Sequence, residues 1–233
     1  MNQTDLLQGQ KPSNSIHMFR AMVGIGLLCA LLIVVSYEYT LPVIKHNKAV
    51  ALEKAVFQVI PGAVKRVTYK LTDQNTFEEM QGEPQKEQVV YAGYDANNQL
   101  AGIAVEASGQ GFQDVLKLLY GYSPTDQKII GFYVLESKET PGLGDKIEKD
   151  NDFLANFSGL DVLLSDDANA LKNPVKSVKH GTKENPWEID SITGATISSK
   201  AVGNIINNSI SYWAPLLYKN ISTFTGNQVS SLE

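Results

Sequence analysis

The stretch DSITGATISSKAVGNIINNSISYW, residues 190–213, joins a hydroxyl-rich segment to a pattern typical of an amphipathic helix. Its first eleven residues hold five hydroxyl side chains, one glycine and one alanine. The apolar residues that follow recur at helical spacing, which predicts a helix with one buried face over 197–213. They are Ile197, Ala201, Val202, Ile205, Ile206 and Ile210.

Several strand-like segments precede this helix. They lie at residues 66–72, 87–95, 99–107, 114–123 and 128–137. The last four segments form two pairs. Turn residues at 96–98 join the first pair and turn residues at 124–127 join the second, which favours antiparallel hairpins. A short helix is expected at 147–157. The sequence therefore predicts an α+β fold with a twisted, mainly antiparallel sheet and flanking helices.

A long apolar segment comes first in the chain. No charged residue lies between Arg20 and Glu38, and a partly apolar extension to Ile44 brings the segment to the roughly 20 residues that span a bilayer. A buried helix of a soluble domain would have a polar face, and none is visible here. A cleavable signal peptide would end at a small-residue site, and none follows. We expect a retained transmembrane helix at 21–44, after a short cytoplasmic tail at 1–20.

The other expected boundaries follow from composition. Residues 45–60 predict a juxtamembrane helix, closed by Pro61 and Gly62. Residues 61–219 are expected to form one domain, and 220–233 a loose, polar C-terminal tail. Basic residues lie on both sides of the apolar segment, so the positive-inside rule leaves its orientation open.

Composition also excludes several kinds of function. The chain has 233 residues and a net charge of −5, and it contains no long basic run, which argues against nucleic acid as a partner. Cys29 is the only cysteine, so an intramolecular disulfide and a cysteine-held iron–sulfur cluster are excluded. His17, His46 and His180 lack zinc-ligand spacing, and no metal site is expected. Redox chemistry would therefore need an organic cofactor.

The hydroxyl-rich segment has two interpretations. The N-terminus of a helix presents free backbone N–H groups and a partial positive charge, so it suits a phosphate, and Gly194 and Ala195 would let that phosphate approach the backbone. Alternatively, Thr193, Thr196 or Ser198 is an ordinary N-cap. The residues alone leave both interpretations open.

Two motifs carry a resemblance to a known family. Residues 190–196, DSITGAT, resemble the flavinylation motif D-x-x-[S/T]-G-A-T of FMN-binding domains at all seven positions. Residues 139–147, ETPGLGDKI, are similar to a segment of the G subunit of the Rnf electron-transport complex. The C subunit of the sodium-translocating NADH:quinone reductase shares the ETPGLG part. Ser137 departs from the pattern, because many members have histidine there.

The resemblance implies a site for covalent FMN. A flavin transferase would join the FMN phosphate to Thr196 through a phosphoester bond. Leu143 would stack on the flavin ring and Thr140 would bind its edge, while Asp190 would present the acceptor hydroxyl or hold the metal ion of the transferase. Gly111 and Phe112 belong to a turn that resembles a family G-x-G-aromatic turn, or to a plain loop. The other expected site residues are Glu139, Pro141, Gly142, Gly144, Ser191, Thr193, Gly194, Ala195 and Ser198.

The resemblance also implies a function. It predicts an electron-transfer subunit with no complete active site of its own, in a membrane complex that couples electron flow between ferredoxin and NAD to ion translocation. Its partners would be multi-span flavin and iron–sulfur subunits. The FMN domain would lie on the periplasmic side of a bacterial inner membrane. The alternatives are the C subunit of a sodium-translocating NADH:quinone reductase, and a membrane-tethered assembly or sensory module without flavin.

Overall fold

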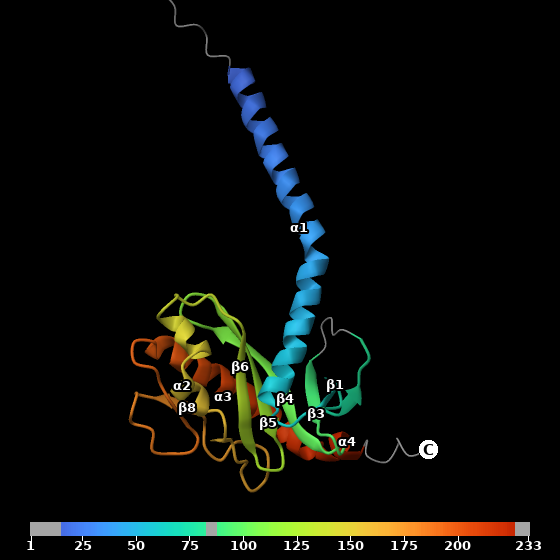
Figure 1. Ribbon diagram of the computed structural model, residues 1–233, viewed down its shortest axis with the longest axis vertical. Coiled ribbons are helices and arrows are strands. Elements are labelled where there is room, and N and C mark those ends of the chain that lie inside the picture. Colours follow the sequence, from blue (N-terminus) through green and yellow to red (C-terminus); the bar gives the residue numbers. More distant parts are fainter. Residues whose placement is uncertain (1–14, 83–87, 227–233) are drawn as a thin grey trace, which may run out of the picture. The chain divides into compact units, whose positions relative to one another are not determined.

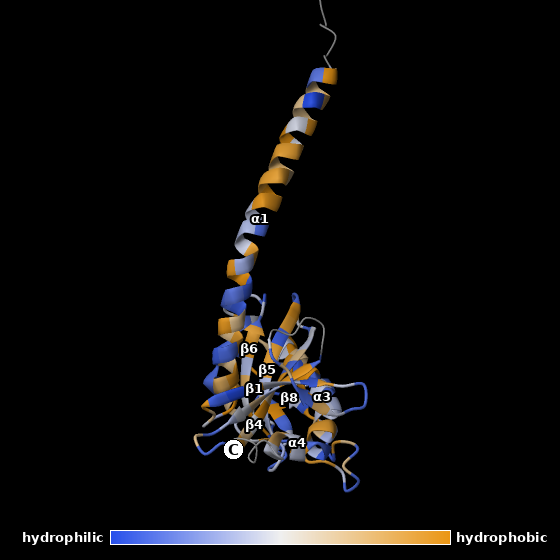
Figure 2. Ribbon diagram, turned by 90° about the vertical axis from the view of Figure 1, so that its right-hand side faces the viewer, coloured by the Kyte–Doolittle hydropathy of each residue, from blue (hydrophilic) through white to orange (hydrophobic). Residues whose placement is uncertain are grey.

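Helix α1, Ser15–Val59, is the first element of the computed structural model, which describes residues 15–82 and 88–226. The chain divides into two units with the boundary between Val50 and Ala51, and each is considered by itself. Within the described residues, α1 is the one helix that is long and apolar enough to cross a membrane. Figure 2 shows a continuous hydrophobic stretch in its first half.

Helix α1 is longer than the expected transmembrane segment. It joins residues 15–20, the expected span and the expected juxtamembrane helix into one helix of 45 residues, with Pro42 inside it. Between Pro42 and Pro61 the sequence has no glycine or proline that would end a helix, so no break separates the two expected helices. The helix ends at Val59, just before Pro61 and Gly62, as expected.

A seven-stranded sheet forms the centre of the second unit (Figure 1). Its strands run in the order β2-β1-β3-β4-β5-β6-β7, and every neighbouring pair is antiparallel. Both predicted hairpins are confirmed, since Val90 pairs with Val105 and Tyr120 with Phe132. The strands are β1 Lys65–Leu71, β2 Phe77–Glu79, β3 Val89–Tyr94, β4 Leu100–Gln110, β5 Val115–Ser123, β6 Lys128–Glu136 and β7 Leu160–Asp161.

Sequence pattern did not predict the shortest elements. Strands β2 and β7 hold three and two residues, and β8 (Lys176–Val178) pairs in parallel with β9 (Glu188–Asp190) in a separate small sheet. Such strands are too short to show the alternation that marks a half-buried strand. The helix expected at 147–157 is divided into the 3₁₀ helix η1, Gly144–Glu148, and helix α2, Asn151–Ala155. The division occurs because the Asp150 side chain accepts a hydrogen bond from Phe153 N and starts a new helix.

Helix α3, Thr196–Lys219, packs against one face of the large sheet (Figure 1). Val202, Ile206 and Ile210 are fully buried there, at the spacing that the sequence predicts. Each such side chain contributes about 1.5–3 kcal/mol by leaving water. This packing fixes the start of α3 near the loops that leave the sheet.

The end of α1 within the second unit covers the opposite face. Ala55, Val56 and Val59 pack in a second apolar cluster with Tyr91 of β3 and Leu119 of β5. The sheet is therefore buried on both sides, by α3 and by the last turns of α1.

Four glycines lie under the end of α1 or under the residues that follow it. They stand on neighbouring strands as two paired sets, Gly93 with Gly102 and Gly121 with Gly131. A Cβ atom at any of them would contact Val59, Ile60, Ala63 or Ile130 at 3.0 Å or less. At Gly121 and Gly131 the missing side chains let the backbone of Val59, at the end of α1, lie directly on the sheet, while Gly93 and Gly102 make room for side chains of Ile60, Ala63 and Ile130.

The start of the expected C-terminal tail is ordered. Helix α4, Ile221–Thr225, places the fully buried Phe224 ring 4.9 Å from Tyr69 and 5.0 Å from Phe77. Tyr94 Oη donates a hydrogen bond to Phe224 O at 2.9 Å. The expectation of a loose tail from 220 onward is therefore wrong for these residues, because one aromatic side chain is enough to anchor the segment in the core. Residues 227–233 lie outside the described part.

Candidate cofactor-binding site

A tight turn follows strand β6. Leu143 N donates to Thr140 O at 3.1 Å, and Gly142 between them has φ +77°. Proline at the second position and glycine with positive φ at the third are typical of a type II turn. The turn presents the side chain of Leu143, which is 52% exposed.

The start of α3 has no hydroxyl cap among the described residues. Ala195 is the N-cap residue, and no side chain within the described residues caps it. Thr196 is the first residue of the helix, and Gly194, with φ +84°, turns the chain into it. The N-cap interpretation of the threonines and Ser198 is therefore wrong. The first N–H groups of the helix remain available for an anion.

Ser199 holds the loop against the helix. Its buried hydroxyl accepts a hydrogen bond from Ile192 N at 3.1 Å and donates one to Ala195 O at 2.9 Å. These two bonds fix the path of the chain before Thr196. Sequence analysis did not select Ser199, since the residue types of five neighbouring hydroxyl side chains do not show which of them are buried.

A cavity of about 290 Å³ lies between the turn and the start of α3. Seven of its nine lining residues were expected in the site, and the other two are Phe112 and Ile197. Phe112, Leu143 and Ile197 are large apolar side chains with exposures of 56%, 52% and 60%. Exposed apolar groups around a concave surface are typical of a binding site. The seven expected residues are Thr140, Leu143, Gly144, Gly194, Ala195, Thr196 and Ser198.

The remaining expected residues lie around this cavity rather than in its lining. Pro141 and Gly142 are exposed on the outside of the turn. Asp190, Ser191 and Thr193 line a second, polar cavity of about 220 Å³. The structure therefore divides the DSITGAT motif between two cavities.

Asp190 makes its contacts within this second region. Its carboxylate accepts a hydrogen bond from Gly181 N at 2.8 Å and lies 3.4 Å from His180 Nδ1. Its backbone is held by Asn156, whose Oδ1 accepts from Asp190 N at 3.0 Å. These bonds hold the strand that leads into the motif against the neighbouring turn.

Glu139 lies behind the wall of the 290 Å³ cavity. Its side chain is buried, with 5% of the residue exposed. Its Oε2 accepts a hydrogen bond from Ser198 Oγ at 2.6 Å, and its Oε1 accepts from Phe112 N at 2.7 Å. Three segments form the cavity. The Glu139 carboxylate contacts two of them, at Phe112 and Ser198, and Glu139 itself belongs to the third, which continues into the turn.

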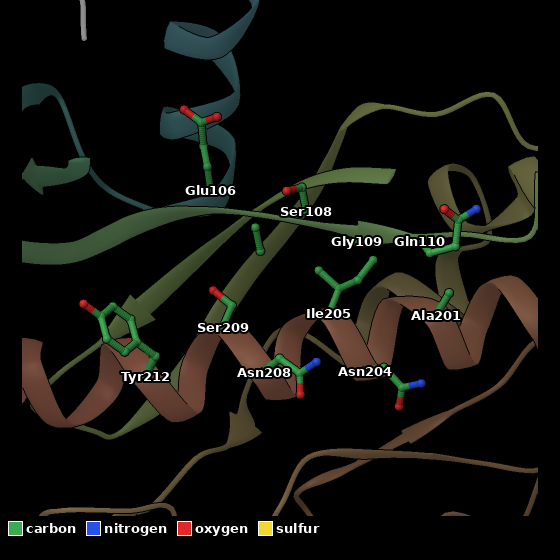
Figure 3. Close-up of a pocket in the computed structure, with 11 residues that line it drawn as sticks. Glu106, Ser108, Gly109, Gln110, Ala201, Asn204, Ile205, Asn208, Ser209 and Tyr212 are labelled. Atoms are coloured by element: carbon green, nitrogen blue, oxygen red, sulfur yellow. The ribbon is translucent and has the colours of Figure 1, made fainter. Parts of the chain in front are cut away.

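A further hollow, of about 420 Å³, lies between the end of β4 and α3 (Figure 3). Figure 3 shows Ile205 rising from α3 toward Gly109 of β4. A Cβ atom at Gly109 would lie 2.6 Å from Ile205 Cγ1, so glycine permits this close packing. The hollow contains none of the expected site residues.

Glu188 provides a pH-dependent anchor for the strand that enters the motif. The N–H groups of Glu184 and Asn185 donate to its carboxylate and lower its pKa from 4.5 to about 2. Because the folded pKa is below the unfolded one, this contribution to stability is present above pH 4.5 and is lost as the pH falls toward 2.

Glu188→Gln is therefore expected to lower the free energy of unfolding at pH 7. It should also flatten the dependence of that free energy on pH between 4.5 and 2. Urea unfolding of both proteins at several pH values measures the effect. Equal slopes for the two proteins in this range would contradict it.

The geometry defines a class of protein: an α+β domain with an N-terminal apolar helix and a cavity at the start of a long helix. The FMN-binding domain family matches residues 111–211, which include the whole cavity lining. The G subunit of the ion-translocating oxidoreductase complex of Methanosarcina acetivorans is 30% identical over 193 residues, which cover 82% of this chain and 90% of that protein. The chain belongs to this family of G subunits.

Further relatives agree with this assignment. The G subunit of the same complex in Shewanella piezotolerans is 27% identical, over 81% of this chain and 84% of that protein. Among solved structures, the crystal structure of Shewanella oneidensis NqrC has a TM-score of 0.52 at 20% identity. The matched region covers 76% of this chain and 88% of the NqrC chain. At that identity the likeness concerns the fold, and it agrees with the expected α+β class.

Proposed function

We propose that this protein is an electron-transfer subunit that carries FMN bound covalently to Thr196 through a phosphoester. It relays electrons within a membrane-bound, Rnf-type oxidoreductase that acts between ferredoxin and NAD and is coupled to ion translocation. The observation that carries the proposal is the cavity at the uncapped start of α3, where Thr196 meets exposed apolar side chains.

The chain offers suitable partners for the phosphate. Thr196 is exposed, so its hydroxyl is accessible to a transferase, and the first N–H groups of α3 lie beside it. A helix N-terminus stabilises an anion at this position. Gly194 has open space where its Cβ would be, so nothing on that side restricts the approach of the phosphate.

The cavity also suits a flat aromatic ring. Phe112, Leu143 and Ile197 provide apolar surface, and Thr140 provides a hydroxyl at the edge. Its volume of about 290 Å³ is just below the 300–1,000 Å³ that is usual for ligand pockets. Such a cavity holds a ring system in part and leaves one edge accessible to a redox partner.

Bound FMN supplies the electron-transfer chemistry, and the protein positions it. The chain itself provides no complete active site in this proposal, so substrate oxidation and ion movement belong to multi-span flavin subunits and iron–sulfur subunits. A flavin transferase acts during maturation. The site consists of Thr196 with the twelve residues named from the motifs, to which the cavity adds Phe112 and Ile197.

The proposed location rests on helix α1 and on the resemblance of the motifs. Helix α1 anchors the protein in the inner membrane by a single span, and the FMN domain lies on the periplasmic side, as the resemblance of its motifs implies. An assembly or sensory module without flavin is the competing function, and no feature of the cavity favours it.

Protein purified from its native membrane tests the proposal. We expect a denatured gel band that fluoresces as a flavin, with a mass increase of one FMN moiety on the peptide that contains Thr196. Protease added to intact spheroplasts should digest the fluorescent domain. Correctly processed protein without flavin would support the assembly module instead, and a protected domain would reverse the assigned side of the membrane.

A further inference from the structure

Glu139 connects three separate segments of the chain. It precedes the type II turn, its Oε1 accepts from Phe112 N at 2.7 Å and Gln113 N at 3.2 Å, and its Oε2 accepts from Ser198 Oγ at 2.6 Å. Residues of all three segments line the cavity at Thr196. One side chain thus holds together a loop after β4, the turn after β6 and the first turn of α3.

All three hydrogen bonds are donated to the carboxylate. The O–H···O distance of 2.6 Å to Ser198 lies in the range of charge-assisted bonds, about 2.5–2.7 Å. Such an arrangement suits an ionised carboxylate, which accepts hydrogen bonds and donates none. None of the described residues that line the cavity has an ionisable side chain, so Glu139 supplies the charge directly behind its wall.

Two glycines make room for this carboxylate. A Cβ atom at Gly111 would lie 2.5 Å from Glu139 Oε1, and one at Gly144 would lie 2.5 Å from Oε2. Both glycines belong to segments that form the cavity. The backbone of each segment therefore approaches the carboxylate directly, and the buried charge fixes how closely the segments meet.

We propose that Glu139 is a positioning residue that assembles the flavin cavity and places a fixed negative charge beside it. The assembly role depends only on the contacts above. The electrostatic role rests on the proposed function, because it requires FMN in the cavity. A fixed negative charge opposes the addition of electrons to a nearby group, so Glu139 lowers the reduction potential of the flavin.

Hydrogen exchange of the full chain in detergent, before flavin attachment, tests the assembly role. In Glu139→Ala the amides of Phe112 and Gln113 lose their acceptor, and we expect their exchange to accelerate by about tenfold or more. Glu139→Gln retains the shape and one carbonyl oxygen, so its exchange should be intermediate. Unchanged exchange at both amides in the alanine variant would overturn the assembly role, whether or not the protein carries flavin.

Redox titration of the flavin-loaded protein tests the electrostatic role of Glu139. Glu139→Gln removes the charge and keeps the volume, so we expect a higher midpoint potential. The expected rise corresponds to an increase on the order of tenfold in the equilibrium constant for reduction of the flavin. The matched control is Glu188→Gln, which removes another buried carboxylate that accepts two backbone N–H bonds but does not line or contact the cavity. The control should leave the potential unchanged. Equal potentials for Glu139→Gln and the unmodified protein would overturn the electrostatic role.

Discussion

Thr196→Ala is expected to abolish covalent attachment of FMN and, with it, electron transfer through the complex. The substitution removes the hydroxyl that forms the proposed phosphoester and leaves the cavity lining otherwise intact. Thr196 is exposed and is not the N-cap of α3, so the change in unfolding free energy should stay within about 0.5 kcal/mol. Flavin fluorescence of the denatured protein and its thermal unfolding measure the two effects.

Two variants of the same loop serve as controls. Thr193→Ala removes the other threonine hydroxyl of the motif, which is exposed but lines the second cavity, so it separates loss of the acceptor from loss of a motif residue. Thr196→Ser keeps a hydroxyl at the acceptor position and should be flavinylated in part. Flavin that persists in Thr196→Ala would show that another hydroxyl is the acceptor, and flavin lost in Thr193→Ala as well would point to recognition of the whole loop.

Gly121→Ala is expected to lower the free energy of unfolding more than any other substitution proposed for this chain. The added Cβ would lie 1.9 Å from Val59 O and 2.8 Å from Val59 C, and both are backbone atoms that no side-chain rotation can move away. The end of α1 would have to leave the sheet and uncover the cluster of Val56, Val59 and Leu119. We expect a loss of about 3 kcal/mol, which is a fall of roughly 6–12 °C in Tm for a chain of this size.

Thermal unfolding of the full chain in detergent, followed by tryptophan fluorescence, measures this loss. The control is Gly159→Ala, because a Cβ at Gly159 meets nothing within 4 Å and the φ of this residue is not positive. Its Tm should change little. A Gly121→Ala protein as stable as the control would show that α1 does not rest on the sheet at this position.

The elements that the sequence predicted are those with repeated patterns. The five long strands, the two hairpins and the buried face of α3 follow from alternation or helical spacing. The proposed acceptor Thr196 and the turn at Gly142 lie in motifs whose residue types and spacing are visible in the chain. A pattern that repeats every two or about four residues is a local property, so it can be read without knowing the contacts.

The features that the sequence left undetermined depend on contacts between distant segments. Phe224 belongs to the core because Tyr69 and Phe77 meet it there, and nothing in residues 220–226 shows this. Phe112 reaches the cavity because Glu139, 27 residues away, binds its backbone N–H.

The sequence by itself determined an apolar N-terminal helix, an antiparallel α+β domain and, at the start of a helix, a motif that resembles the flavinylation motif of FMN-binding domains. Only the tertiary structure decided which hydroxyls face inward, that Asp190 binds a neighbouring turn, and that Glu139 lies behind the cavity instead of in it. The physical reason is that a buried polar group needs a hydrogen-bond partner, and the partners of these side chains come from segments that meet only when the sheet and α3 have packed.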